Sequence, residues 1–187
     1  AYTVGANVLL RDLPTLGNER TLAQGAQPHF ASDGARLFFY QERAIQSRRL
    51  DGSDLRTFYQ DEALTDSFDL TTSEADFASI RQRQVPRLGI PALCIVLEPH
   101  FGAPTVSRYT HQWDIAEEIA VAADGRWLAY HVIGFCTPTT LGSSTPPDFC
   151  LVDLATSERT CLEHADYRDP DFAPPGHWVS FAASLTG

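Results

Sequence analysis

The residues best suited to chemistry are carboxylates that occupy corresponding places in a repeating sequence. Asp69 (or its neighbour Phe68), Glu118 and Asp169 hold three of these places, and Gln27 holds a fourth. If the side chains converge, the carboxylates repel one another unless they are protonated or bridged by a cation. A hard cation such as Ca²⁺ prefers oxygen ligands of this kind. The pattern predicts a cation site; the alternative is that these side chains point into solvent.

A second set of residues has the composition of a protein-binding surface, in which Arg and aromatic side chains contribute most of the binding energy. The set lies near two long irregular segments, 82–92 and 137–149, and near acidic links such as 111–118. Loops of this length on a rigid scaffold often carry binding function, although they are also tolerated as simple insertions. The predicted binding residues are Arg81, Arg83, Arg87, Phe101, Tyr109, Trp113, Asp114 and Tyr167.

The four cysteines show no CxxC spacing and no nearby histidine pattern, which argues against a structural zinc site. Cys136 and Cys150 bracket a segment rich in Pro, Ser and Thr, and we expect a disulfide between them. The alternative is that all the thiols are reduced and buried, and no partner can be assigned to Cys94 or Cys161. The chain also contains no Met, so Ala1 is not an initiator residue and we expect that an upstream segment is removed. Both observations favour a periplasmic or secreted protein.

Composition excludes two classes of partner. A net charge of −10 over 187 residues repels nucleic acid and anionic lipid. No apolar run approaches the roughly 18 residues that a membrane-spanning helix needs. A hydrophobic content of 43% is enough for a folded core. We therefore expect a globular chain with no nucleic-acid partner and no transmembrane segment.

A repeat supplies the elements that must position these residues. Two-residue turns occur at Asp33-Gly34, Glu74-Ala75, Asp124-Gly125 and Pro175-Gly176, with their second residues 41, 50 and 51 residues apart. An apolar segment precedes each turn, and an alternating, aromatic-rich segment follows it. Alternation with period two indicates strands, and Asp-Gly between two such segments indicates a hairpin. Trp127 and Trp178, which follow two of these turns, are expected in the core between repeats.

A second hairpin follows each first one, at 45–58, 94–110 and 150–163, and a further copy at 7–23 has no first hairpin before it. The fourth copy of the first hairpin, at 169–187, has no second hairpin after it. Four units of four strands result, with one unit split between the chain ends. This period is typical of β-propeller blades. The prediction is an all-β propeller of four-stranded antiparallel blades in one domain, 1–187, with blade pieces 1–24 with 168–187, 25–60, 65–111 and 114–164; a β-sandwich is the alternative.

Two stretches, "PHFASDGARLFFYQ…IQSRRLDGSDLRTF" and "IAVAADGRWLAYHV…FCLVDLATSERTCL", resemble TolB-like propeller repeats. The resemblance covers most of the chain, and it is weak over 60–112, where Glu74-Ala75 replaces the Asp-Gly pair. Members of that family usually have more than four blades. The expected arrangement is a closed four-bladed ring, similar to the hemopexin type; the alternative is an arc that another chain completes.

The resemblance implies protein–protein interaction in a bacterial envelope. The sequence contains no GxSxG, GxxxxGK or HExxH pattern, so it favours a non-catalytic role and predicts no catalytic residue. We expect an extracytoplasmic protein-binding module or an accessory subunit of a larger assembly, for which an unpaired blade edge is one way to join. The alternative is a small-ligand, cation or sugar site, or a hydrolase- or lyase-type site, at the channel mouth. Asp114, Glu117, Glu118 and Asp169 would then be the residues to mutate first.

Overall fold

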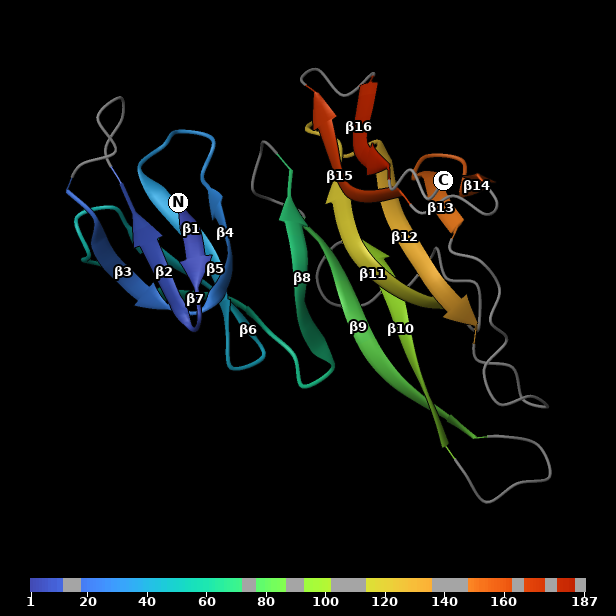
Figure 1. The fold of residues 1–187 in the computed structure, drawn as a ribbon, viewed down its shortest axis with the longest axis horizontal. Helices are drawn as coiled ribbons and strands as arrows, with labels where there is room; N and C mark the ends of the chain where they lie inside the picture. Colours follow the sequence, from blue (N-terminus) through green and yellow to red (C-terminus); the bar gives the residue numbers. More distant parts are fainter. Residues whose placement is uncertain are drawn as a thin grey trace. The chain divides into compact units, whose positions relative to one another are not determined.

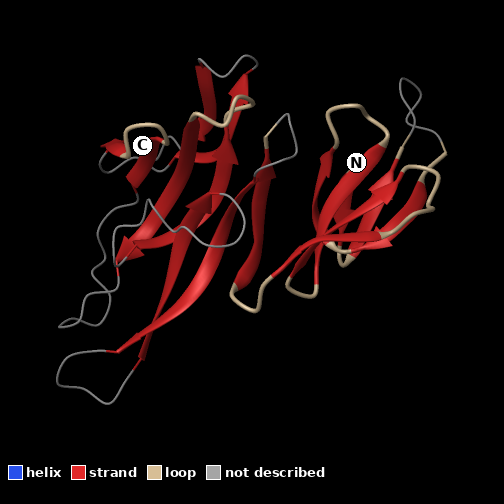
Figure 2. Cartoon of the chain, turned by 180° about the vertical axis from the view of Figure 1, so that it is seen from behind, coloured by secondary structure: helices blue, strands red, loops and turns tan. Residues whose placement is uncertain are grey.

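The computed structural model describes residues 1–11, 18–71, 77–86, 93–101, 114–135, 148–162, 167–173 and 178–183. Every regular element in these ranges is a β-strand (Figure 2), which confirms the predicted all-β class. The described part of the chain therefore contains no apolar helix of bilayer-spanning length. The chain divides into two compact units, Ala1–Asp66 and Ser67–Gly187, each of which is described by itself.

The first unit contains two sheets (Figure 1). The three-stranded sheet has the order β1-β2-β3, with strands Tyr2–Val4, Asn7–Leu10 and Arg20–Gln24. The four-stranded sheet has the order β4-β5-β6-β7, with strands Ala26–Phe30, Arg36–Gln41, Ala44–Arg49 and Arg56–Gln60. Val8 and Leu22 of the smaller sheet pack against Leu37 and Phe39 of the larger one. This buried layer stabilises the first unit because it removes apolar surface from water.

The second unit is built on a sheet of consecutive strands with the order β14-β13-β12-β11-β10-β9-β8. Strand β8 covers Leu64–Leu70 and begins just before the boundary between the units. The strands that follow are β9 (Phe77–Pro86), β10 (Leu93–Phe101), β11 (Asp114–Val121), β12 (Trp127–Phe135), β13 (Asp148–Asp153) and β14 (Glu158–Leu162). A separate hairpin, called the C-terminal hairpin below, consists of β15 (Tyr167–Ala173) and β16 (Trp178–Ala183).

The join between β10 and β11 differs from the predicted arrangement of separate four-stranded units. These two strands meet in parallel, through Leu97 and Ile115, so the sheet continues from one predicted unit into the next. The strand expected after β10 falls in 102–113, outside the described residues. The predicted pairing of residues 7–23 with 169–187 joins two units that are described separately, and it stays a prediction, as does the single domain.

The predicted Asp-Gly hairpin turns are confirmed at Asp33-Gly34 and Asp124-Gly125. In both turns the glycine N–H donates to the carbonyl oxygen three residues earlier, at 2.9 and 2.8 Å. In both, the aspartate Oδ1 accepts from the N–H two residues later, at 2.8 and 2.9 Å. The two glycines have φ of 66° and 71°, which glycine adopts without steric cost. The same sequence therefore builds the same turn in both units.

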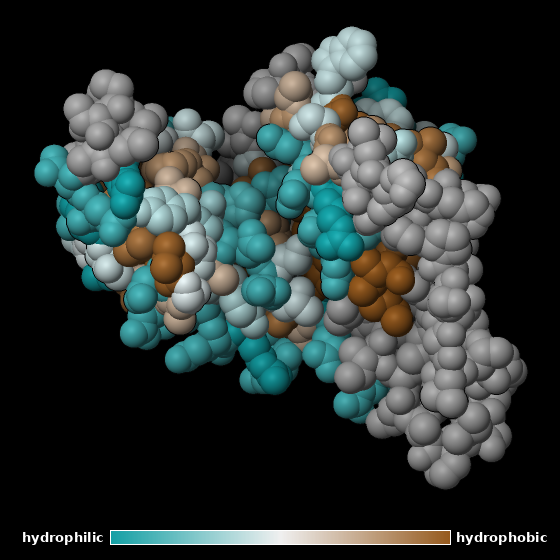
Figure 3. Space-filling view, viewed as in Figure 1, coloured by the Kyte–Doolittle hydropathy of each residue, from teal (hydrophilic) through white to brown (hydrophobic). Residues whose placement is uncertain are grey.

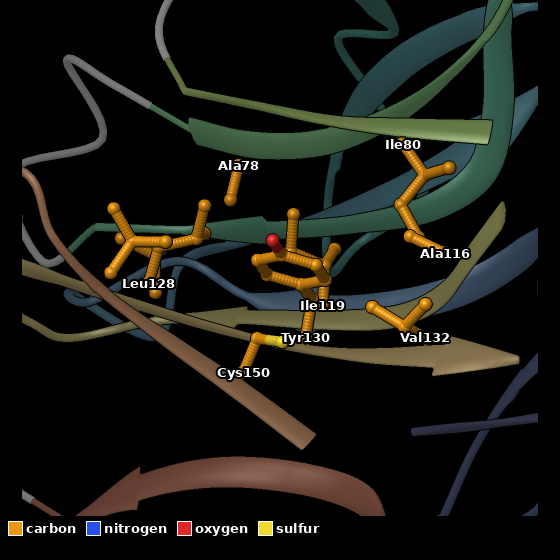
Figure 4. Close-up of a cluster of buried hydrophobic side chains, with 10 residues drawn as sticks. Ala78, Ile80, Ala116, Ile119, Leu128, Tyr130, Val132 and Cys150 are labelled. Atoms are coloured by element: carbon orange, nitrogen blue, oxygen red, sulfur yellow. The ribbon is translucent and has the colours of Figure 1, made fainter. Parts of the chain in front are cut away.

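Within this seven-stranded sheet, side chains of β9 pack against those of β11, β12 and β13 and form the core of the second unit (Figure 4). The part of the sheet made by strands β11 to β14 is named the β11–β14 sheet. Ala78 and Ile80 point from β9 toward a layer that includes Leu128, Tyr130 and Val132 of β12. All five side chains are at most 1% exposed. The alternation of β12 sends these side chains to one face and their neighbours in sequence to the other.

The two tryptophans expected in the core are not fully buried. Trp127 is half-buried, with the Arg126 guanidinium carbon 5.4 Å from the ring centroid, and Trp178 is 77% exposed. The reason is register. The core expectation aligns both tryptophans with the buried Leu37. Counted from the turn glycine, Trp127 matches Arg36 instead, and a one-residue shift moves a side chain to the opposite face of a strand.

Candidate functional site: an incomplete sheet beside β13 and β14

The predicted binding residues are only partly open to description. Arg81, on β9, is half-buried, while Arg83 and Asp114 belong to described strands. Arg87, Tyr109 and Trp113 lie outside the described residues, as do most of the two irregular segments. The described residues therefore do not decide whether these side chains form one surface, and the binding surface stays a prediction.

Two of the predicted binding residues, Phe101 and Tyr167, pack inside the second unit. Phe101 is half-buried against the β9–β12 core. The Tyr167 ring lies 6.1 Å from the Phe149 ring and 4.2 Å from the Phe181 ring, measured between centroids. These aromatic contacts join the C-terminal hairpin to β13. Tyr167 therefore packs against aromatic rings within the second unit.

Two of the carboxylates that are predicted to hold a cation accept hydrogen bonds from backbone N–H groups. Each of these bonds joins strands that stand about one repeat apart in the sequence. Asp69 Oδ2 accepts a hydrogen bond of 2.8 Å from the backbone N–H of Val121, 52 residues further along. Glu118 Oε2 accepts one of 2.7 Å from the backbone N–H of Asp169, 51 residues further along. Among the described residues, no group of three or more His, Cys, Asp or Glu is arranged to hold a metal ion. Two of the three carboxylates, Asp69 and Glu118, thus accept backbone hydrogen bonds, and the cation site stays a prediction.

The sequence alignment of these positions is nevertheless reflected in the backbone. Gln27, Glu118 and Asp169 have φ of 50°, 50° and 51°, a left-handed conformation that is uncommon outside glycine. Each lies at a shift in the strand register, as a β-bulge does. A bulge redirects the local chain. The repeat thus preserves a bulge at this position in three strands, whatever the side chain.

The predicted disulfide between Cys136 and Cys150 is wrong, because Cys150 is bonded to Cys161. These two residues lie directly opposite each other on β13 and β14. Cys136 is outside the described residues. The Arg159 guanidinium lies 3.1 Å from Cys150 Sγ and 5.6 Å from the Tyr130 ring centroid. The disulfide closes the β13–β14 hairpin at its end away from the turn.

The turn between β13 and β14 is fixed by Asp153. Its Oδ1 accepts from the Ala155 N–H at 2.9 Å, and its Oδ2 accepts from Arg126 at 3.1 Å. The hydrogen bond from Ala155, followed by the contact with Arg126, holds the pKa of the Asp153 carboxyl below its usual value. The charged carboxylate is therefore the form that the folded turn favours.

The β11–β14 sheet is covered unevenly on the face opposite β9. Ala129 and Phe149 on this face are buried under Tyr167, Phe172 and Val179 of the C-terminal hairpin. Phe149 is 1% exposed, whereas Leu162, its cross-strand neighbour on β14, is 48% exposed. Directly opposed residues in a sheet point to the same face. The hairpin cover therefore ends between β13 and β14.

The C-terminal hairpin is itself incomplete. It has two strands, whereas the β4–β7 sheet has four, and β16 pairs only with β15 among the described strands. Val179 of β16 faces the covered part of β13, while its neighbour Trp178 is 77% exposed. Figure 3 shows hydrophobic surface gathered in patches among hydrophilic residues on one face of the molecule. Large exposed apolar side chains beside an unpaired strand edge mark this hairpin as the candidate site.

The sequence shows that the hairpin at 169–187 has no second hairpin after it, but the predicted binding residues do not include Leu162. A signal was present, because Cys150 and Cys161 stand at equal distances from the β13–β14 turn, which places Phe149 opposite Leu162. That pairing shows which apolar residues share a face. It does not show where their cover ends, because this depends on the width of the neighbouring sheet.

Comparisons with known proteins give the fold a wider context. No protein-family model matches the chain. No curated protein matches it at the sequence level either.

Solved structures do match, at low identity. A TolB protein from Agrobacterium tumefaciens is 19% identical, with a TM-score of 0.58 over 91% of this chain and 59% of that one. The β-propeller domain of Cps50 (Swd1) from Myceliophteria thermophila is 17% identical, with a TM-score of 0.58 over 95% of this chain and 56% of that one. A chain of the mitotic checkpoint complex is 12% identical, with a TM-score of 0.53 over 97% and 65%. The chain thus spans less than two thirds of the length of each, and its fold is propeller-like, without an assigned sequence family.

Proposed function

We propose that this chain is a non-catalytic protein-binding module, or an accessory subunit of a larger assembly, built as part of a β-propeller. One observation carries the proposal. Among the described strands of the second unit, β16 of the C-terminal hairpin pairs only with β15, and the unit also exposes Trp178 of β16 and Leu162 of β14. Apolar surface that borders an unpaired edge invites pairing with another polypeptide.

The candidate carboxylates support a structural role over a catalytic one. Asp69 of β8 accepts a hydrogen bond from a backbone N–H of β11, and Glu118 of β11 accepts one from a backbone N–H of β15. A carboxylate engaged in this way positions a backbone segment, and general acid–base work requires a group that can instead reach a substrate. The proposed function therefore assigns no catalytic residue.

The disulfide between Cys150 and Cys161 supports an extracytoplasmic location, in the periplasm or outside the cell. Stable disulfides form in oxidising compartments and are rare in a reducing cytosol. An envelope or extracellular assembly is therefore the setting that we propose for the partner protein.

The predicted closed four-bladed ring would join residues 1–24 with 168–187 in one blade. In the first unit, β2 of the 7–23 piece pairs with β1 and β3. The closed ring and the arc that another chain completes both stay predictions.

The test is purification of the chain from its native source, followed by light scattering and cross-linking with mass spectrometry. The proposal predicts a stable complex whose cross-links include residues near 158–162 or 178–183. A chain that is monomeric in native extract at micromolar concentration would contradict it. A complex cross-linked only through the first unit would contradict the site.

A further inference from the structure

We propose that the Cys150–Cys161 disulfide is a reversible thiol-exchange site, at which an external thiolate attacks Cys161 and Cys150 leaves as a thiolate beside Arg159. The co-reactant is a thiol, and glutathione is the probe used below. The inference goes beyond the proposed function and does not rest on it, because the proposed function takes the disulfide only as a sign of an oxidising compartment.

Three strands bring the groups of this site together on one face. Tyr130 of β12 lies opposite Cys150 of β13 (Figure 4), and Cys150 lies opposite Cys161 of β14. Directly opposed residues in a sheet point to the same face. Arg159 stands two residues before Cys161 on β14, so its side chain points to that face as well. The face therefore carries both sulfurs, an aromatic ring and a guanidinium.

Arg159 holds a positive charge at one sulfur of the pair. Its Nη2 lies 3.1 Å from Cys150 Sγ, and its guanidinium carbon lies 5.6 Å from the centroid of the Tyr130 ring, within cation–π range. Cys150 and Tyr130 are both 0% exposed, and attraction between charges is stronger where water is excluded. When the disulfide opens, the guanidinium therefore stabilises a thiolate on Cys150 relative to a neutral thiol.

The two sulfurs differ in their access to solvent. Cys150 belongs to the buried core of the second unit, whereas Cys161 is half-buried and packs against that core. The rate of exchange depends on access to the attacked sulfur and on the stability of the thiolate that leaves. Both factors favour the same direction, in which Cys161 is attacked and Cys150 leaves.

The exchange proceeds in two balanced steps. First, a thiolate forms a bond to Cys161 Sγ while the disulfide bond breaks, and the electron pair of the broken bond goes to Cys150 Sγ. The products are a mixed disulfide on Cys161 and a thiolate on Cys150. A second thiolate then attacks the external sulfur of the mixed disulfide and releases Cys161 as a thiolate. The cysteine pair gains two electrons, which the two external thiols lose as they form their own disulfide.

The β13–β14 hairpin has other contacts that keep the two cysteines opposed after the bond opens. Backbone pairing joins the two strands on both sides of the disulfide. At the turn, the Ser157 N–H donates to the Asp153 carbonyl oxygen at 2.8 Å, and the Ala155 N–H donates to Asp153 Oδ1 at 2.9 Å. Because these contacts do not involve sulfur, the Cys150 thiolate stays close to Cys161 and can reverse the first step.

The first experiment treats the intact, oxidised protein with reduced glutathione at neutral pH and stops the reaction at increasing times with excess N-ethylmaleimide. Proteolysis and mass spectrometry should find glutathione on Cys161 and maleimide on Cys150. Reduction should also be faster than global unfolding, which hydrogen exchange of the most protected amides measures. Glutathione on Cys150 instead, or reduction no faster than global unfolding, would overturn the inference.

Variants of Arg159 separate its charge from its packing. Arg159→Gln removes the charge beside the sulfur and should slow reduction about tenfold, while Arg159→Lys should restore most of the lost rate. Arg126→Gln breaks the ion pair with Asp153 at the turn of the same hairpin and should change the rate less than about twofold. A purely structural Arg159 would give the opposite sign, because a loosened hairpin exposes the disulfide and accelerates its reduction. Circular dichroism verifies that each variant is folded.

The equilibrium with a glutathione redox buffer supplies a second readout. Because Arg159 stabilises the reduced form, Arg159→Gln should shift the equilibrium about tenfold toward the disulfide. Reduction of Arg159→Gln as fast as that of the natural chain, no rescue by Arg159→Lys, or an unshifted equilibrium would each overturn the inference. None of these results bears on the proposed function, which co-purification and cross-linking test separately.

Discussion

The two faces of the β11–β14 sheet differ in how completely they are covered. On the face toward β9, Leu128, Tyr130 and Val132 are at most 1% exposed. On the other face, Phe149 is 1% exposed under the two described strands of the C-terminal hairpin, whereas Leu162 is 48% exposed. The face of a sheet is buried only as far as the neighbouring sheet that packs against it extends. Among the described residues, the second face is therefore the less completely covered of the two.

The largest expected effect on stability comes from shortening a buried side chain on the face toward β9. Leu128→Ala removes a fully buried side chain and should lower the free energy of unfolding by about 3 kcal/mol. Leu162→Ala, the same substitution on the uncovered face, should lower it by less than about 1 kcal/mol because the side chain is already half in water. Urea denaturation of the two variants measures both changes. Equal losses would mean that Leu162 is covered in the folded protein, and the contrast between the faces would fail.

The disulfide on the face toward β9 should have a comparable effect. Replacing Cys150 and Cys161 together by Ala opens a loop closed over 11 residues and should lower the free energy of unfolding by up to about 3 kcal/mol. Thermal unfolding of the oxidised protein and the double variant measures the difference. Peptide mapping of the oxidised protein should recover Cys150 linked to Cys161; recovery of a Cys136–Cys150 peptide would contradict the structure.

A smaller effect is expected at the hydrogen bond that links β11 to the C-terminal hairpin. Glu118→Ala removes the carboxylate that accepts a hydrogen bond from the Asp169 N–H, and it should lower the free energy of unfolding by about 1 kcal/mol. Glu117→Ala is the control, since Glu117 is an exposed neighbour on the same strand. Hydrogen exchange at the Asp169 amide should accelerate in the first variant alone. If both variants accelerate it equally, the hydrogen bond does not hold the hairpin in place.

The smallest effect is a pH dependence at the β13–β14 turn. The pKa of Asp153 is lowered in the folded state, so its contribution to stability is fully present above the usual Asp range and is lost as the pH falls through the lowered pKa. Asp153→Asn should therefore reduce the difference in melting temperature between pH 6 and pH 3, by the part that Asp153 contributes. Asp124→Asn, at an exposed Asp in another turn, serves as the comparison. An unchanged acid dependence in Asp153→Asn would contradict the assigned contacts.

Features set by neighbours in sequence could be predicted from the sequence. The Asp-Gly turns follow from local backbone preferences, and the repeat places Gln27, Glu118 and Asp169 at corresponding positions, although the bulge that they share is seen only in the structure. Features set by register or by a neighbouring sheet could not. The Cys150 partner depends on the β13–β14 register, and the burial of Trp127 and Trp178 changes with a one-residue shift. The uneven cover of Leu162 depends on a sheet whose width no local pattern encodes.

Amide hydrogen exchange along β16, compared with β12, tests the central claim most directly. Strand β12 lies between β11 and β13, so its amides should be protected along its length. Strand β16 pairs only with β15 in the described part of the chain, so its amides that point away from β15 should exchange much faster in the isolated, monomeric protein. Alternating fast and slow exchange over 178–183 is the predicted result. Uniform protection of β16, equal to that of β12, would show that its edge is already occupied and would contradict the open docking edge.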